Sequence, residues 1–290
     1  MPVDDAPGVA CRDVPAGASP LGPFPPRSRA PSSGAMADLL RSELLTRHGF
    51  AHGFALRTGG VSAPPFDSLN LGRGLGDAPD AVAENHRRLA EAVGYGRLFE
   101  LSQVHGRRVR AVGAGEDPVA VRQEEGDALF ATEPGVAVGV RVADCAPLLI
   151  ADPGTGAVAA VHAGWRGVEA RIAEAAIEAL EEIGASREAL LVAIGPHIRL
   201  GWFEVGEEVA ERLEAVAHGV TCVDRTTGDK PHVDLTAILF AQLAALGVAR
   251  ARIDDLGGCT YADRSRFFSY RRDGKATGRH LAVIVARGAA

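Results

Sequence analysis

The stretch VADCAPLLIADPGTGAVAAVHAGWRG, residues 142–167, decides the fold because it holds two apolar segments joined by a turn signal. The segments LLIA and AVAAV are typical of buried strands, and DPGTG between them predicts a tight connection. If Asp152 faces Ala157 across an antiparallel hairpin, the numbers of paired residues add up to 309, and Pro147 faces His162. The stretch therefore predicts a β-hairpin with a defined register.

This register brings two chemically active side chains together. Cys145 lies two residues before Pro147, so it shares a face of the sheet with His162 as a diagonal neighbour. Diagonal neighbours lie about 7 Å apart. One metal ion can then accept a thiolate at about 2.3 Å and an imidazole at about 2.0 Å. A buried cysteine beside a hydrogen-bonded histidine is the common structural alternative, because both residue types often lie inside proteins.

The residues around this pair favour a functional site. Asp144 directly precedes the cysteine, and HAGWRG leads into a predicted helix that begins near Val168. The backbone N–H groups of a helix start have no partner within the helix, so together with Arg166 they suit an anion. We therefore predict metal-type ligands and an anion site close to one another.

Composition limits the classes of function. The chain has 290 residues, of which 47% are hydrophobic, and a formal net charge of −6. It is long enough to bury a sizeable core, and it lacks the basic stripe that binds nucleic acid or an anionic membrane. It also has no apolar run of about 18 residues that would span a bilayer. Four scattered cysteines indicate a reducing compartment. We expect a cytoplasmic protein that acts on small molecules, as a monomer or a weak homodimer.

The chain divides into two parts of different composition. Residues 1–35 are rich in Pro, Ala and Ser and show no periodicity, so we predict a disordered tail. Residues 36–290 are predicted to form a single catalytic domain. Strands are expected at Val136–Val142, Leu148–Asp152, Ala157–Ala163, Leu191–Ile194 and Leu281–Val285, and helices at Asp80–Val93, Val168–Ile183, Glu207–Val216 and Leu235–Leu246. Since strands and helices do not alternate regularly, an α+β fold with mixed or antiparallel sheets flanked by helices is favoured over a doubly wound sheet.

Several motifs in order resemble those of the YfiH family, whose members are also called laccase-domain or polyphenol oxidase proteins. The motifs are SQVHG at 102–106, GDAL at 126–129, VADCAPLLIAD at 142–152, VHAGWRG at 161–167 and CTYADRSRFFSYRRDGKATGR at 259–279. The resemblance implies the α+β fold of that family. It implies zinc-dependent phosphorolysis of purine nucleosides such as adenosine, inosine and methylthioadenosine, and deamination of adenosine. It also implies that Zn²⁺ is bound by His105, Cys145 and His162.

The implied ligands make chemical sense as a set. Three protein ligands leave one position of a tetrahedral zinc site open, and zinc lowers the pKa of a water molecule in that position. Asp144 is the candidate general base, with a hydrogen-bonding role at the strand end as its alternative. Phosphorolysis needs phosphate beside the sugar, and arginine binds phosphate through two parallel hydrogen bonds. The candidate substrate-binding and phosphate-binding residues are Arg57, Asn70, Arg166, Arg271 and Arg272.

Three other functions stay open at this point. The same geometry permits a metal-free hydrolase in which Cys145 is the nucleophile and His162 its base. A laccase-like copper polyphenol oxidase ranks last, because the chain has no H-x-H pair and few clustered histidines. Outside enzymology, a role in the maintenance of cell-wall composition, through binding in the same pocket, also stays open.

Overall fold

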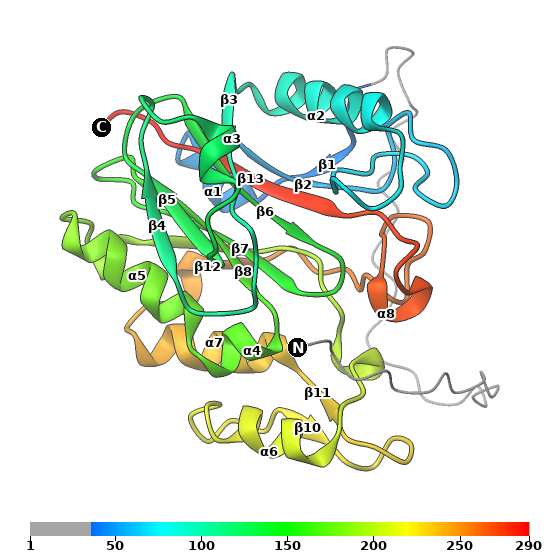
Figure 1. Ribbon diagram of the computed structural model, residues 1–290. Helices are drawn as coiled ribbons and strands as arrows, with labels where there is room; N and C mark the ends of the chain where they lie inside the picture. Colours follow the sequence, from blue (N-terminus) through cyan, green and yellow to red (C-terminus); the bar gives the residue numbers. More distant parts are fainter. Residues whose placement is uncertain (1–35, 290) are drawn as a thin grey trace. The chain divides into compact units, whose positions relative to one another are not determined.

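The computed structural model describes residues 36–289, which contain two mixed β-sheets and a two-stranded ribbon (Figure 1). The five-stranded sheet has the order β1 (Leu39–Leu40), β2 (His52–Ala55), β13 (His280–Val285), β6 (Val136–Val142), β3 (Arg97–Phe99). The six-stranded sheet has the order β12 (Ile253–Asp255), β9 (Leu191–Ile194), β7 (Ala146–Ala151), β8 (Val158–Ala163), β5 (Ala128–Ala131), β4 (Val109–Val112). The ribbon pairs β10 (Val223–Asp224) with β11 (His232–Val233).

The helices of the described residues are short apart from three. They are α1 (Glu43–Arg47), α2 (Pro79–Val93), α3 (Pro118–Val121), α4 (Trp165–Glu169), α5 (Ile172–Glu182), α6 (Glu207–Glu214), α7 (Leu235–Ala245) and α8 (Tyr270–Asp273). The long helix α2 begins with a proline, which suits the first helical position, and stops at Gly94 in the left-handed conformation.

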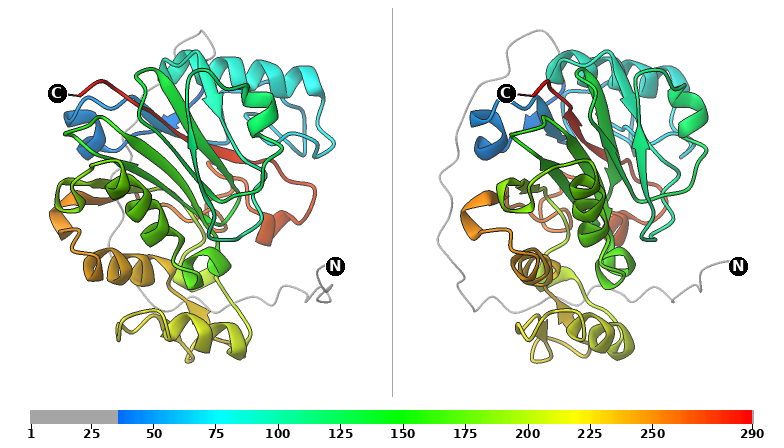
Figure 2. Two further views of the ribbon diagram at one scale, coloured as in Figure 1. Left: turned by 60° about the vertical axis from the view of Figure 1, so that its left-hand side comes forward. Right: turned by 90° about the vertical axis from the view of Figure 1, so that its left-hand side faces the viewer.

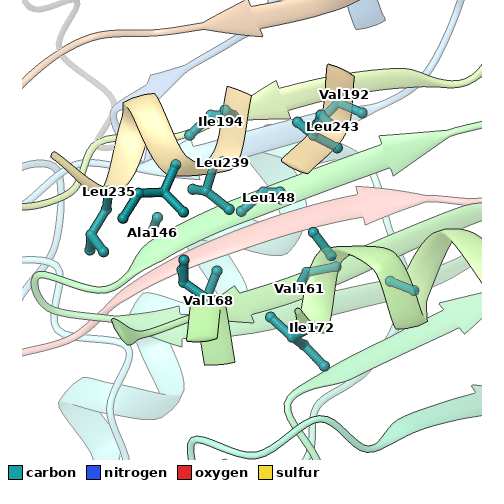
Figure 3. Close-up of a cluster of buried hydrophobic side chains, with 14 of the residues drawn as sticks. Ala146, Leu148, Val161, Val168, Ile172, Val192, Ile194, Leu235, Leu239 and Leu243 are labelled. Atoms are coloured by element: carbon teal, nitrogen blue, oxygen red, sulfur yellow. The ribbon is translucent and has the colours of Figure 1, made fainter. Parts of the chain in front are cut away.

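Three apolar clusters hold these elements in layers. One cluster fills the space between the two sheets, with Val138 of β6 and Leu149 of β7 among its members. A second packs the outer face of the five-stranded sheet against α2. The third packs the outer face of the six-stranded sheet against α4, α5, α6 and α7. Figure 2 shows α2 on the other side of the sheets from α5 and α7. In Figure 3, Leu239 of α7 lies beside Leu148 of β7, and Leu235 of α7 lies beside Ala146.

The predicted α+β class and the hairpin register are both confirmed. Both large sheets are mixed, because β3 runs parallel to β6 in one and both β4–β5 and β12–β9 are parallel in the other, while their remaining strand pairs are antiparallel. Within the hairpin, Pro147 pairs with His162, and the backbone N–H of Asp152 donates to the carbonyl of Ala157 at 2.9 Å. The turn length therefore determines which residues share a face.

The helix predicted at Val168–Ile183 is wrong, because two helices occupy this region. The helices α4 and α5 are separated at Arg171, whose φ of 58° is left-handed and ends the α-helical conformation. After this change of direction both helices contact β8 and α7, but α4 also contacts α6, whereas α5 also contacts β5 and β4. Tertiary packing against different neighbours thus overrides the continuous amphipathic pattern.

The predicted disordered tail lies outside the described residues, and residues 36–289 lie in one compact unit. Among the helices of that unit, none combines the length and the apolar character needed to cross a membrane.

Candidate active site

Three side chains with metal-binding atoms meet at one end of the six-stranded sheet. Cys145 directly precedes β7, and His162 lies near the end of the neighbouring strand β8. His105 comes from the loop between β3 and β4. One ligand atom of each residue lies within 4.8 Å of those of the other two, and Cys145 Sγ lies 3.8 Å from His105 Nε2.

The loop that carries His105 is held by side-chain hydrogen bonds on both sides. Gln103 forms a pair of bonds with the backbone of Arg141 in β6, each of 2.8 Å, as a strand neighbour would. On the other side, the buried carboxylate of Asp127 accepts from the backbone N–H of His105 at 2.9 Å. His105 itself has a φ of 59°, so the loop curls and presents its ring toward Cys145.

The donor set fits a metal ion in both chemistry and spacing. Thiolate and imidazole are zinc ligands, and bond lengths of about 2.3 and 2.0 Å place donors in a tetrahedral site about 3.5 Å apart. The observed separations exceed this value by at most about 1.3 Å, and the exposed His105 ring can rotate to close the gap. His162 donates Nδ1–H to Asp127 at 2.8 Å, so Nε2 is the ring nitrogen that can bind a metal once it has lost its proton. The three residues can hold one metal ion.

Cys145 and His162 also shift each other's ionisation in the absence of a metal. Burial is the largest influence on the Cys145 thiol and raises its pKa, but the His162 and His105 rings outweigh it, so the pKa falls to about 6. Burial lowers the pKa of His162, but the Cys145 charge and the Asp127 carboxylate outweigh it, so the pKa rises to about 9. The pair is therefore a thiolate and an imidazolium at neutral pH.

A cleft of about 590 Å³ opens onto these residues. Four arginines line it, and Glu100, which is 2% exposed, pairs with two of them. Aromatic and aliphatic side chains line it as well. The arginines are Arg73, Arg141, Arg271 and Arg279, and the aromatic residues are Trp165, Phe203 and Tyr270.

Two of the other predicted site residues also line this cleft. Asp144 is 9% exposed, and its carboxylate accepts from the Thr260 hydroxyl at 2.7 Å and from the backbone N–H of Arg271 at 2.6 Å. The guanidinium of Arg271 donates to the carbonyl of Glu204 and lies 5.4 Å from the Phe203 ring. Asp144 thus holds the segment that carries Arg271 against the metal-binding end of the cleft.

The remaining predicted residues do not line the cleft. Arg57 forms an ion pair with Asp67 and borders a separate hollow. Arg272 donates to three backbone carbonyls and to Asp273, so its guanidinium is occupied.

Asn70 and Arg166 also lie outside the lining. Asn70 is fully buried and ties Gly72 to the backbone of Arg279 through its side-chain oxygen. Arg166 is exposed, and its guanidinium lies 4.3 Å from the ring centre of Trp165, which does line the cleft.

Sequence reasoning missed Arg73, Arg141 and Arg279, as well as Asp127. Arg279 ends the motif DGKATGR and Asp127 belongs to GDAL, so both stood in motifs that had been singled out. Arg73 and Arg141 carried no such signal, because a loop arginine and a strand arginine are usually surface residues.

Gly164 offers a test of how tightly the three ligands pack. It precedes α4 with a φ of −67°, which suits any residue, but an added Cβ would lie 2.8 Å from His105 Cδ2 and 3.0 Å from Cys145 Sγ. We expect Gly164→Ala to displace the exposed His105 ring and to weaken zinc binding about tenfold or more, with little loss of melting temperature. Titration against a chelator measures the affinity. Gly206→Ala is the matched control, because Gly206 precedes α6 in the same conformation with open space around it.

The structure defines a general class, a layered α+β protein with three potential metal ligands in a cleft, and comparison with known proteins identifies the family. The family described as multi-copper polyphenol oxidoreductase laccase matches residues 51–287. The chain belongs to this family, and its relatives include proteins named YfiH, as the motifs predicted.

Similar proteins carry a consistent name. The purine nucleoside phosphorylase of Deinococcus radiodurans is 42% identical over 236 residues, which covers 80% of this chain and 88% of that protein. The purine nucleoside phosphorylase YfiH of Escherichia coli is 40% identical over 231 residues, which covers 79% and 90%. The crystal structure of YlmD from Geobacillus stearothermophilus superposes with a TM-score of 0.80 at 32% identity, covering 88% of this chain and 98% of that one.

Proposed function

We propose that this protein is a zinc-dependent purine nucleoside phosphorylase that also deaminates adenosine. Adenosine, inosine and methylthioadenosine are the proposed nucleosides, and phosphate is the co-substrate. The observation that carries the proposal is a single cleft lined both by three side chains that could hold a metal ion and by four arginines. The names of the relatives in Deinococcus radiodurans and Escherichia coli support the same activity.

We assign His105, Cys145 and His162 as the zinc ligands. Two nitrogen donors and one sulfur donor suit zinc, and three protein ligands are the number typical of catalytic sites. When bound, zinc supplies Lewis-acid chemistry and lowers the pKa of water toward neutrality. Asp144 stays the candidate general base, because each carboxylate oxygen keeps a lone pair beyond the one hydrogen bond that it accepts.

We place phosphate among the arginines that line the cleft, with Arg279 as its main partner. The hydrogen bonds of the Arg279 guanidinium all leave from Nη1, to the carbonyls of Thr277 and Gly278. Within residues 36–289, no carboxylate lies within ion-pair distance of Arg279. Its Nε–H and Nη2–H groups can therefore form the paired hydrogen bonds that a phosphate accepts.

The aromatic walls suit a purine base. Trp165, Phe203 and Tyr270 line the cleft, and aromatic rings bind flat heterocycles by stacking. A cleft of about 590 Å³ falls within the range of small-molecule sites, which is about 300–1,000 Å³. The arginines neutralise phosphate and the charge that develops on the departing purine, which stabilises the transition state for cleavage of the bond to the sugar.

The test is turnover of purified protein with adenosine and with inosine, each with and without phosphate. Phosphorolysis releases adenine or hypoxanthine only when phosphate is present, whereas deamination converts adenosine to inosine in either condition. Chromatography of the bases and nucleosides separates the products. Absence of all three products with zinc-loaded protein would refute the proposal.

The thiolate–imidazolium pair favours a second candidate, a metal-free cysteine hydrolase. Cys145 would be the nucleophile, His162 the base that has already taken its proton, and Asp127 the carboxylate that orients the imidazole, as in a catalytic triad. Metal analysis of protein purified without added zinc separates the two candidates. The hydrolase predicts no metal and rapid alkylation of Cys145 by iodoacetamide, with the rate rising as pH passes about 6. The phosphorylase predicts bound zinc that protects the thiol.

The description of the family supports a copper polyphenol oxidase activity, but the geometry of the metal-binding residues does not. Several coppers need several sets of ligands, and the structure assembles one group of three potential metal ligands within the residues it describes. Its single cysteine and two histidines match zinc as well as copper. We therefore keep this activity, like the cell-wall role, as an outcome to be screened rather than proposed.

A further inference from the structure

Asp127 lies where the His105 loop meets the His162 ring. The residue is 1% exposed, and its two carboxylate oxygens accept four hydrogen bonds. Oδ1 accepts from the backbone N–H of His105 at 2.9 Å and from Nδ1 of His162 at 2.8 Å. Oδ2 accepts from the backbone N–H groups of Val104 at 3.2 Å and Gly106 at 2.6 Å. One side chain therefore contacts two of the three metal-binding residues.

We propose that Asp127 is the positioning residue that sets the geometry of both histidine ligands. It retains a proton on Nδ1 of His162, so the Nε2 lone pair is available to the metal. It also fixes the path of the His105 loop through three consecutive backbone N–H groups. Metal-binding histidines generally donate their second ring N–H to such a partner. The inference rests on the proposed metal site, but it does not depend on which reaction the site performs.

The surroundings make the Asp127 carboxylate a rigid reference point. Its backbone N–H donates to the carbonyl of Arg108 at 3.1 Å, and its carbonyl accepts from the backbone N–H of His162 at 2.7 Å. Both bonds extend the pairing of β5, which starts at the next residue, Ala128. The carboxylate is thus anchored in the sheet, while the loop that it holds contains His105 with a left-handed backbone.

Asparagine has the same shape as aspartate but cannot satisfy these four donors. If the NH₂ group of asparagine replaced Oδ2, this donor would face the backbone N–H donors of Val104 and Gly106. The His105 loop would then separate from the asparagine side chain. If the NH₂ group replaced Oδ1, His162 would have to accept at Nδ1 and carry its proton on Nε2, where it could not bind a metal. Either orientation removes one histidine from the metal site.

The experiment measures the zinc affinity of the full chain by competition with a chelator, in the absence of any nucleoside. We expect Asp127→Asn to weaken zinc binding about 10–100-fold or more. Asp152→Asn is the matched control, because Asp152 is 2% exposed and accepts three hydrogen bonds in the turn at the other end of the hairpin. The control should lose melting temperature and keep wild-type zinc affinity. Equal zinc affinity in both variants would overturn the proposal.

A second measurement needs no variant and remains valid if Asp127→Asn fails to fold. Long-range ¹H–¹⁵N correlation spectra of the zinc-loaded protein distinguish a protonated Nδ1 from a protonated Nε2 on His162. We expect the proton on Nδ1 and the metal on Nε2, and the reverse assignment would overturn the proposal. Because both readouts are independent of turnover, they can succeed even if no nucleoside proves to be a substrate.

Discussion

Cys145→Ala is expected to lose stoichiometric zinc and to lower the turnover of both adenosine and inosine by more than about 100-fold. Loss of an outer hydrogen-bonding partner typically costs about 10–100-fold in metal affinity or activity, and loss of a ligand costs more. The sulfur is also the charged member of the set, so its removal leaves two neutral imidazoles to hold a dication. Metal analysis and initial rates on the same preparation measure the effect.

The fold should survive this substitution. Cys145 is half-buried at the edge of the cleft, and the strands that follow it close on apolar neighbours such as Leu148 and Val161. Cys222→Ala is the control, since Cys222 is buried in the core beside the six-stranded sheet and should affect melting temperature while zinc is retained. Full zinc occupancy and full turnover in Cys145→Ala would show that the three-ligand assignment is wrong.

Arg279→Ala is expected to separate the two reactions. We predict that the transition state for phosphorolysis of inosine loses about 2 kcal/mol or more of stabilisation, which is the cost of removing one partner of a buried charge pair. This corresponds to about thirtyfold in kcat/KM. Deamination of adenosine, which uses no phosphate, should fall much less. The two rates and the phosphate concentration at half-saturation, measured on one preparation, test the prediction.

Three further variants sharpen this test. Arg279→Lys keeps the positive charge and loses the paired hydrogen bonds, so it should recover only part of the phosphorolysis. Arg166→Ala tests the alternative that phosphate binds at the start of α4, in which case it would lose as much as Arg279→Ala. Arg87→Ala, an exposed arginine on α2, is the control and should match the wild type. Equal losses of both reactions in Arg279→Ala would refute a specific phosphate role.

The sequence by itself determined the core hairpin and the pairing of Cys145 with His162. These features depend on a turn of known length and on the alternation of side chains along a strand, and both are local properties. The same locality explains the helix boundaries near Pro79 and Gly94, where proline and glycine have strong conformational preferences. The prediction of His105 as a ligand depended on the family motif, since His105 lies 40 residues before Cys145 and no local rule links the two.

Only the tertiary structure decided which arginines face the cleft. Arg57 and Arg272 are satisfied by a carboxylate and by backbone carbonyls, whereas Arg73, Arg141 and Arg279 reach the cleft from a loop, from β6 and from the residue before β13. These contacts join residues far apart in sequence, so the spacing of the arginines along the chain does not predict them. The role of Asp127 is of the same kind, because a buried carboxylate becomes a positioning residue only when packing brings two histidines to its two oxygens.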